Sequence, residues 1–476
     1  MKEIKKPWIF IVLISFSLCI HAQTQIGNDI DGLLASDKFG TSVSISLDGN
    51  IVAIVGFSGT TGDGRIRVFE NIGGAWTLYG TDINGENFGG IGAFSVSLSA
   101  DGNTLAFGGL LGLDVVKVFS YNTDTGFWTQ KGNDIPNNTS EGVFGFSIKL
   151  SSDGNTLVIG AVSSPIVPAA GVTQIFQFET GSWNQVGDDI NGVEFGEHSG
   201  RSVDISSDGK TVAILNNNSA RVYKNISGAW TLFGDEIPAL GSQYPNSAVS
   251  LSSNGDILAI GEPDYTDSFI QQGRVRVFSH GSGTWNQVGR DINGEVAYYR
   301  TGASVSLSSD GQILAIGEPG STSGSTDRGR TRLFENQGSS WVHIGNDIFG
   351  EASEDYSGGS ISLSSDASTL AIGAYLNDGN GVDAGHARIY DLRATLYVND
   401  FIQPKISLFP NPVANILTID SEIPLTKVEI YSMLGKKLKE INSDFNAIPT
   451  NNLSNGVYIF KIYSENGMAT KKLIKK

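Results

Sequence analysis

Short segments in which apolar and polar residues alternate cover most of this chain, and they recur in the same order roughly every fifty residues. In Ser-Val-Ser-Leu-Ser at 304–308, hydroxyl groups alternate with aliphatic side chains. This period of two predicts a strand with one buried face. An Asp-Gly or related turn and a more apolar strand follow it. The same landmark begins at seven positions: Ser42, Ser95, Ser147, Ser202, Ala248, Ser304 and Ser360.

Two further strands complete the repeat. The third alternates around arginine in several copies, as in Gly-Arg-Val-Arg-Val-Phe from Gly273, and the fourth carries a tryptophan. The Asp-Gly pairs predict type I′ hairpins, whose two central residues both need positive φ. The last copy has Ala367 in place of glycine, where we expect about 1–2 kcal/mol of strain. The tryptophans recur once in each of the first six copies, which favours packing between neighbouring units: Trp76, Trp128, Trp183, Trp230, Trp285 and Trp341.

Seven four-stranded units predict an all-β chain with a seven-bladed β-propeller. One unit of about fifty residues cannot bury enough apolar surface alone, so stacked sheets are expected. The seventh copy ends near Asp391 without a tryptophan strand, whereas residues 23–30 align with residues 128–135. We therefore expect the N-terminal segment to supply the missing strand and to close the ring, which removes a free sheet edge. The alternative is that residues 395–398 occupy this place.

The first 22 residues have the pattern of a secretory signal peptide: lysines, then an apolar run from Trp8 to Ile20, then His21-Ala22. The run is too short for a comfortable membrane span. Cys19, the single cysteine, lies inside it. The mature chain is thus expected to have no transmembrane span, no disulfide and no cysteine metal site.

The composition changes near Gln403, where glycine-rich repeats give way to lysine-rich strands. We predict a propeller over 23–393, a linker over 394–404 and a small β domain over 405–476. The last segment resembles the type A C-terminal sorting domain of the type IX secretion system. The resemblance implies an Ig-like β-sandwich, binding to the secretion machinery, and a secreted or cell-surface location. The residues that carry it include Pro410, Asn411, Pro412, Gly435, Gly456, Tyr458, Lys471 and Lys472.

The repeats resemble FG-GAP repeats, which form the seven-bladed propeller of integrin α-subunits. The matching residues are Phe39-Gly40, Phe144-Gly145 and the strand ends Gly-Glu-Pro at 261–263 and 317–319. The resemblance implies adhesion or ligand recognition on the face with variable loops. Many such repeats carry a calcium loop between their first two strands, where this chain has only Ser-x-Asp-Gly. We therefore expect no cofactor, and calcium dependence lacks a complete loop motif.

The recurring Asp-Ile-Asn-Gly segments, at 82–85 and 291–294, begin like a calcium loop but lack its remaining ligands. Their recurrence between units favours a structural Asx turn. The chain has a net charge of −17 even though both its ends are rich in lysine. Binding of nucleic acid through the bulk field is therefore excluded.

One end of the predicted propeller carries short, uniform turns, and the other carries the variable loops and the linkers between units. Ligand-binding residues usually lie on such variable loops. Aromatic residues among carboxylates suit carbohydrate or cationic ligands. The candidate ligand-binding residues are Glu262, Asp264, Tyr265, Asp267, Tyr298, Glu318, Asp327, Glu354, Tyr356 and Asp378.

Catalytic motifs are lacking in the sequence. Beyond the signal segment, its histidines fall at unrelated repeat positions: His198, His280, His343 and His386. No nucleophile elbow or phosphate loop is present. We predict a non-enzymatic, exported propeller that binds or adheres to extracellular glycans or proteins. The alternatives are a polysaccharide hydrolase that uses acidic loop residues and a structural cell-surface protein.

Overall fold

A computed structural model describes residues 23–57, 64–84, 93–109, 115–138, 143–162, 170–238, 247–320, 327–396, 406–421, 424–432, 437–464 and 467–476. The signal segment over 1–22 lies outside this range. The chain divides into two compact units between Leu396 and Tyr397, and each is described by itself. No helix in the described part is long and apolar enough to cross a membrane.

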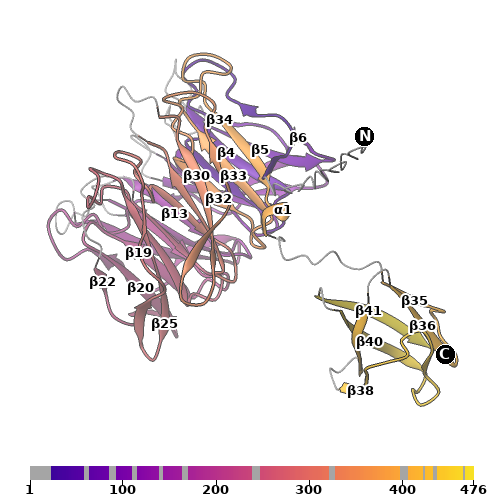
Figure 1. The fold of residues 1–476 in the computed structure, drawn as a ribbon. Helices are drawn as coiled ribbons and strands as arrows, with labels where there is room; N and C mark the ends of the chain where they lie inside the picture. The colour runs from indigo at the N-terminus through magenta and orange to yellow at the C-terminus, as the bar shows by residue number, and fades with distance from the viewer. Residues whose placement is uncertain are drawn as a thin grey trace, which may run out of the picture. The chain divides into compact units, whose positions relative to one another are not determined.

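The described residues of the first unit form seven antiparallel sheets, numbered here in chain order (Figure 1). Sheet 1 contains β3 (Ser42–Ile45), β4 (Ile51–Phe57), β5 (Gly64–Ile72), β6 (Ala75–Leu78) and β7 (Ile83–Asn84). Sheet 2 contains β8 (Ala93–Leu98), β9 (Thr104–Gly109), β10 (Val115–Asn122), β11 (Phe127–Gln130) and β12 (Ile135–Pro136). Sheet 3 contains β13 (Phe144–Leu150), β14 (Thr156–Ala161), β15 (Val172–Glu179), β16 (Ser182–Gln185) and β17 (Ile190–Asn191).

The next three sheets repeat this order. Sheet 4 contains β18 (Ser202–Ile205), β19 (Thr211–Leu215), β20 (Ser219–Ile226), β21 (Ala229–Leu232) and β22 (Ile237–Pro238). Sheet 5 contains β23 (Ala248–Leu251), β24 (Ile257–Glu262), β25 (Arg274–Gly281), β26 (Thr284–Gln287) and β27 (Ile292–Asn293). Sheet 6 contains β28 (Ser304–Leu307), β29 (Ile313–Glu318), β30 (Arg330–Asn336) and a long β31 (Trp341–Phe349).

Sheet 7 combines the two ends of the propeller. It contains β32 (Ser360–Leu363), β33 (Thr369–Ala374) and β34 (His386–Asp391) from the end of the propeller sequence. β34 pairs with β1 (Thr24–Gln25) and β2 (Ile30–Asp31) from its beginning. Thr395 lies instead in the short helix α1 (Arg393–Leu396). Figure 1 shows orange β33 and β34 of this sheet beside the first strands of the ring, β4 and β5. The N-terminal segment is therefore the strand that completes the last sheet.

A ring of backbone hydrogen bonds links all seven sheets at one end of their inner strands. The amide of Leu47 donates to the carbonyl of Ala100 at 2.9 Å, and the same bond passes from sheet to sheet until Ser365 donates to Leu47 at 3.1 Å. The serines of the inner strands join the sheets as well. The hydroxyl of Ser44, for example, accepts the amide of Leu98 in the next sheet at 3.0 Å. The alternating serines thus replace the backbone pairing that the radially arranged inner strands lack.

The turn after each inner strand differs from the predicted type I′ hairpin. The amide of Gly49 donates to the carbonyl of Ser46 at 3.1 Å, and Gly49 has a φ of 73°. Asp48 is not at positive φ; its carboxylate accepts the Ser46 hydroxyl at 2.7 Å and the Asn50 amide at 3.0 Å. These bonds favour a type I turn followed by one left-handed residue. Ala367 takes that place with a φ of 59°, which confirms the strained position expected there.

The tryptophans pack between sheets, as predicted. Trp128 donates its indole N–H to the Tyr79 carbonyl of the preceding sheet at 2.9 Å. Trp76 reaches Ile26 of the completing segment in the same way, at 2.9 Å. Between the sheets lie apolar clusters, and one of them joins Val43, Ile45 and Ile54 of sheet 1 to Ala371 and Ile389 of sheet 7. The ring is therefore closed by packing as well as by strand pairing.

The second unit consists of two small antiparallel sheets around one apolar core. One sheet contains β35 (Ile406–Phe409), β36 (Ile416–Ser421) and β39 (Ile448–Pro449). The other contains β37 (Leu425–Ser432), β38 (Lys437–Ile441), β40 (Gly456–Ser464) and β41 (Gly467–Lys475). Its core residues include Leu417, Val428 and Phe460, none of which exceeds 1% exposure.

Candidate functional site

The linkers between sheets and the loops after each second strand lie at the same end of the propeller. The amide of Tyr298, in the linker after sheet 5, donates to the carbonyl of Ile270, in the loop of sheet 5, at 2.8 Å. The amide of Ser36 likewise donates to the carbonyl of Val382 at 2.7 Å. We call this end the loop face. All ten candidate ligand-binding residues predicted from the sequence lie on or near it.

Two of the candidate carboxylates lie inside the protein. Glu262 and Glu318 stand at the ends of β24 and β29, with 1% and 0% of their surface exposed. In sheet 6, Glu318 accepts hydrogen bonds from Arg330 Nε at 2.5 Å and Arg332 Nε at 2.6 Å. Glu262 of sheet 5 is bound in the same way by Arg274 at 2.7 Å and by Arg276 at 2.8 Å. Each carboxylate is thus neutralised by two arginines from the adjacent strand.

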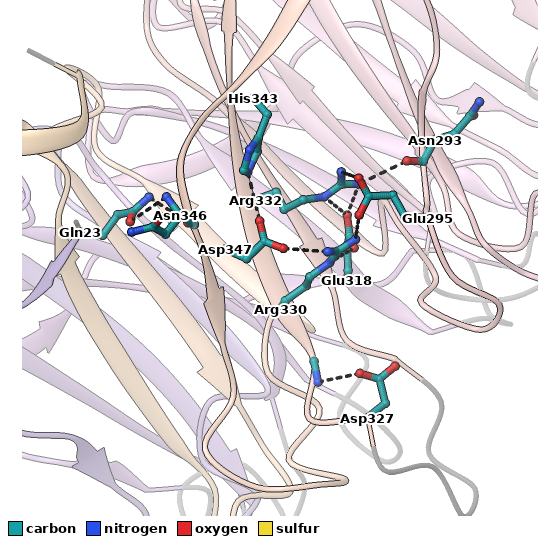
Figure 2. Close-up of polar contacts among 11 residues, drawn as sticks. Gln23, Asn293, Glu295, Glu318, Asp327, Arg330, Arg332, His343, Asn346 and Asp347 are labelled. Atoms are coloured by element: carbon teal, nitrogen blue, oxygen red, sulfur yellow. Dashed lines mark hydrogen bonds and ion pairs between the residues drawn. The ribbon is translucent and has the colours of Figure 1, made fainter. Parts of the chain in front are cut away.

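Figure 2 shows how far the network around Glu318 extends. Arg330 also contacts Asp347 at 2.7 Å and Glu295 at 3.1 Å, while Arg332 contacts Glu295 at 3.4 Å. Burial disfavours the charged form of Arg330, but Glu318, then Asp347 and Glu295, outweigh this and raise its pKa. The network therefore stabilises charge inside sheet 6 and leaves no free carboxylate at Glu318.

A second polar cluster joins sheets 5, 6 and 7. The guanidinium of Arg300 donates to Asp264 and to the hydroxyl of Tyr356, both at 3.3 Å. The ring of Tyr356 meets Tyr375 edge-on, with centroids 5.0 Å apart. Burial raises the pKa of Asp264 and of Tyr356, and Arg300 only partly offsets this effect. These side chains come from four neighbouring connections, so the cluster braces the loop face.

The other candidates are more accessible. Asp267, Tyr298, Glu354 and Asp378 are exposed, and Tyr298 has 45% of its surface in solvent. The ring of Tyr265 is covered by the Arg274 guanidinium, 3.8 Å from its centroid. Asp327 accepts the Gly329 amide at 3.4 Å, and burial raises its pKa. The structure thus separates the ten candidates into an exposed set and a set held in structural networks. Residues 163–169 and 321–326, which belong to two of the variable loops, lie outside the described part.

Sequence reasoning missed the apolar side chains of the loop face. Phe195 has 79% of its surface exposed, Val382 has 69% and Val193 has 67%. Others are present on the connections at this end: Leu33, Leu34, Phe269, Ile270 and Val296. The sequence shows the runs Val-Glu-Phe at 193–195 and Phe-Ile at 269–270, but their exposure depends on which neighbours cover them.

The Asp-Ile-Asn-Gly segments have a structural role of a different kind from the expected Asx turn. Their aspartate meets a basic or amide side chain from the third strand of its sheet: Arg67–Asp82 at 3.2 Å and Arg274–Asp291 at 2.9 Å are examples. In sheet 7 the corresponding contact is between His386 and Asp29, at 3.5 Å. Asp29, Asp31 and His386 form the one group among the described residues whose ligand atoms lie close enough to share a metal ion.

A narrow cavity of about 120 Å³ lies at the inner turns and is lined by residues from all seven sheets. Serines line most of it, but Lys149 and Asp204 form a charged pair, 3.6 Å apart, where the serine pattern is interrupted. The volume matches about four water molecules. This volume is below the roughly 300 Å³ of the smaller ligand pockets.

No curated protein matches the chain. Residues 407–476, however, match the family described as the secretion system C-terminal sorting domain. The C-terminal unit is a type IX secretion sorting domain. The protein is therefore exported across the outer membrane, to the cell surface or the extracellular space.

The predicted motif residues of the sorting domain form part of its structure. Asn411 donates to the carbonyl of Lys472 and accepts the amide of Ile474, both at 2.9 Å, which fixes the Pro410–Pro412 segment to the terminal strand. The hydroxyl of Tyr458 donates to the Ser454 carbonyl at 2.8 Å. Gly456 begins β40, Lys471 lies in β41, and Gly435 is outside the described residues.

Solved structures similar to the first unit are β-propellers. A putative 6-phosphogluconolactonase from Bacteroides uniformis aligns with a TM-score of 0.50 and 14% identity, over 66% of this chain and 87% of that one. The Cps50 (Swd1) β-propeller domain of Myceliophteria thermophila aligns with a TM-score of 0.49 and 12% identity, over 76% and 99%. A periplasmic gluconolactonase of Pseudomonas aeruginosa aligns with 0.47 and 15%, over 66% and 87%. At such identities the likeness concerns the fold alone.

Proposed function

We propose that this exported propeller is a non-catalytic binding module that adheres to an extracellular protein through its loop face. The exposed apolar side chains of that face carry the proposal. Isolated exposed residues are common on soluble proteins, but groups of them mark interaction sites. In two places a linker and a loop with exposed apolar residues meet. The Ser36 amide, close in sequence to Leu33–Leu34, donates to the Val382 carbonyl, and the Tyr298 amide donates to the Ile270 carbonyl.

The kind of side chain favours a protein partner over a glycan. Most of the exposed residues are aliphatic, as at Val193, Ile270 and Val382, and aliphatic groups match apolar protein surfaces. Phe195, Phe269 and Tyr298 supply the aromatic anchors from which protein interfaces draw much of their binding energy. The resemblance of the repeats to FG-GAP propellers agrees with this adhesive role.

The networks around the buried glutamates weigh against the rival interpretation as a polysaccharide hydrolase. Hydrolysis of a glycosidic bond needs two carboxyl groups that face the substrate. Glu262 and Glu318 are buried, and each is neutralised by two arginines. Asp264 is bound to Arg300. These carboxylates brace the loops rather than meet a sugar.

The test measures retention of the full chain on isolated cell envelopes, extracellular proteins and polysaccharides, while released sugars are monitored. The double variant Phe195→Ser/Phe269→Ser removes two anchors from the loop face. The matched control is Phe127→Ser/Ile226→Ser, because these residues are also exposed, at 53% and 61%, but lie at the opposite end of the sheets.

We expect retention on a protein-bearing surface, at least a tenfold loss in the loop-face variant, corresponding to about 1.4 kcal/mol, and no loss in the control. Protease treatment of the surface should abolish retention. Equal retention of both variants would refute the loop face as the binding surface. Soluble sugar products would show a hydrolase instead.

A further inference from the structure

The seventh sheet departs from sheets 5 and 6 at two facing positions. His386 opens β34, where Arg274 and Arg330 open β25 and β30. Its cross-strand neighbour is Asp31, whereas Arg274 faces Asn293 and Arg330 faces Phe349. The acid two positions before, Asp29, corresponds to Asp291 and Asp347, which pair with those arginines. Sheet 7 has therefore replaced a strong cation by an imidazole and added a carboxylate.

The imidazole of His386 is buried without a hydrogen-bond partner. The residue is 1% exposed, and neither of its ring nitrogens forms a hydrogen bond. Its Nδ1 faces three carboxylates, with Asp29 Oδ2 at 3.5 Å, Asp31 Oδ1 at 3.9 Å and Glu351 Oε2 at 4.0 Å. A buried polar group left without a partner costs about 1–3 kcal/mol, and such groups in native proteins call for an explanation.

The distances from the His386 nitrogen to these oxygens are longer than those of hydrogen bonds and closer to the spacing between two ligand atoms of one metal ion. Tetrahedral ligands bonded to zinc at about 2.1 Å lie roughly 3.4 Å from one another. The ligand atoms of Asp29, Asp31 and His386 all lie within 4.8 Å of one another, so shifts of the side chains alone can close the shell. Gln25 donates to the other oxygen of Asp29, Oδ1, at 2.5 Å, which orients Oδ2 toward the histidine. Outer partners of this kind are typical of metal ligands.

We propose that Asp29, Asp31 and His386 bind one zinc ion, with Glu351 as the nearest candidate for the fourth ligand. An imidazole nitrogen with carboxylate oxygens is a donor set that zinc accepts. Calcium, in contrast, takes oxygen ligands in larger number.

The position of this zinc site gives it a role in the fold. Asp29 and Asp31 belong to the N-terminal segment, and His386 belongs to the last strand of the ring, so the ion joins the two ends of the propeller. An ion that binds the folded state and not the unfolded chain adds to the stability of the folded state. Zinc is therefore expected to stabilise the closed ring, independently of what the loop face binds.

The repeat provides its own matched variant. His386→Arg with Asp31→Asn gives sheet 7 the arginine, aspartate and asparagine that sheet 5 has at Arg274, Asp291 and Asn293. Ala374 still stands where sheet 5 has Glu262. The purified full chain, stripped by chelator, is titrated with zinc chloride by calorimetry, and its thermal unfolding is followed with and without the metal. His343→Gln serves as the control, because His343 forms a more exposed contact with Asp347 at 3.1 Å.

We expect one zinc ion per chain and a rise in Tm with zinc, unchanged in the His343→Gln control. In the double variant, zinc affinity should fall at least about tenfold. Loss of a partner that only hydrogen-bonds to a metal ligand already lowers metal affinity by about 10–100-fold, and the double variant removes two of the ligands themselves. The propeller of the metal-free variant should still unfold in a cooperative transition, which shows that the variant folds. Zinc binding that persists in the double variant, no rise in Tm, or a preference for calcium over zinc would overturn the proposal.

Discussion

Removing the carboxylate of Glu318 tests whether the buried network of sheet 6 stabilises the propeller. Glu318→Ala leaves Arg332 with only Glu295, at 3.4 Å, and with the carbonyl of Asn293. Arg330 keeps Asp347 and Glu295. Breaking a buried ion pair by removing one partner costs about 3–5 kcal/mol, because a charge is left buried without compensation. We expect the lower end of this range, since Arg330 retains two acids.

The expected shift in Tm follows from the size of the unit. Unfolding entropy is about 2.1 cal/mol/K per residue, which gives roughly 0.8 kcal/mol/K for about 370 residues. A loss of about 3 kcal/mol then lowers Tm by about 4 °C. The matched control is Glu295→Ala: its side chain is 63% exposed and contacts the same two arginines. Solvent screening limits the cost of its removal to about 1 kcal/mol or less.

Calorimetric scans of the parent and the two variants distinguish these expectations. The far-ultraviolet spectrum should remain that of a β protein in each case, because Glu318 lies at the end of β29 and its backbone pairing with Arg330 persists. If Glu318→Ala and Glu295→Ala lower Tm by the same amount, burial does not decide the energy of this network, and the reasoning is refuted.

Three further predictions concern the inner strands and their turns. Ser97→Ala removes the acceptor of the Leu150 amide, 3.0 Å away, and should cost about 1–3 kcal/mol in chemical denaturation, whereas exposed Ser340→Ala should change stability by less than about 0.5 kcal/mol. Ala367→Gly should leave stability equal or raise it by up to about 1 kcal/mol. Relief of the backbone strain, about 1–2 kcal/mol, exceeds the roughly 0.8 kcal/mol that is lost with the buried methyl group. A clear loss of stability would contradict strain at this turn. Burial alone would raise the pKa of the turn aspartates, but hydrogen bonds from the serine and the backbone lower it in the folded state. The contribution of these aspartates to folding stability is therefore complete at a pH above their unfolded-state pKa of about 3.9. It is lost as the pH falls through their lower folded-state pKa. Replacing these aspartates by asparagine should make acid unfolding less steep, and an unchanged acid transition would count against this account. The aspartates concerned are Asp48, Asp101, Asp153 and Asp366.

Much of the fold could be predicted because the repeat states the same local physics seven times. Period-two alternation defines the strands, and one tryptophan per copy fixes the packing between sheets. The error at the turns has a clear cause: Asp-Gly was interpreted from the φ preferences of a two-residue hairpin. In the structure the Ser46 hydroxyl and the Asp48 carboxylate bind each other and the backbone, which favours a different turn with one left-handed residue.

The candidate site was less predictable, because sequence shows the type of a residue but not its partners. Glu262 and Asp267 lie in the same loop region, yet one is bound by two arginines and the other is exposed. The recurrence of Gly-Glu-Pro with Gly-Arg-x-Arg in sheets 5 and 6 was a signal for this pairing. The exposure of Phe195 or Val382 had no such signal, since it depends on which neighbours cover them.

The sequence by itself determined the repeat, the strand order within each unit and the C-terminal sorting domain, because these depend on periodicity and spacing along the chain. Only the tertiary structure decided which carboxylates are neutralised, which apolar side chains remain uncovered and which groups meet across the closure. His386, Asp29 and Asp31 are separated by most of the propeller sequence, and they become neighbours because the ring closes. Burial and pairing are properties of contacts between distant segments, and such contacts arise only when the seven sheets pack together.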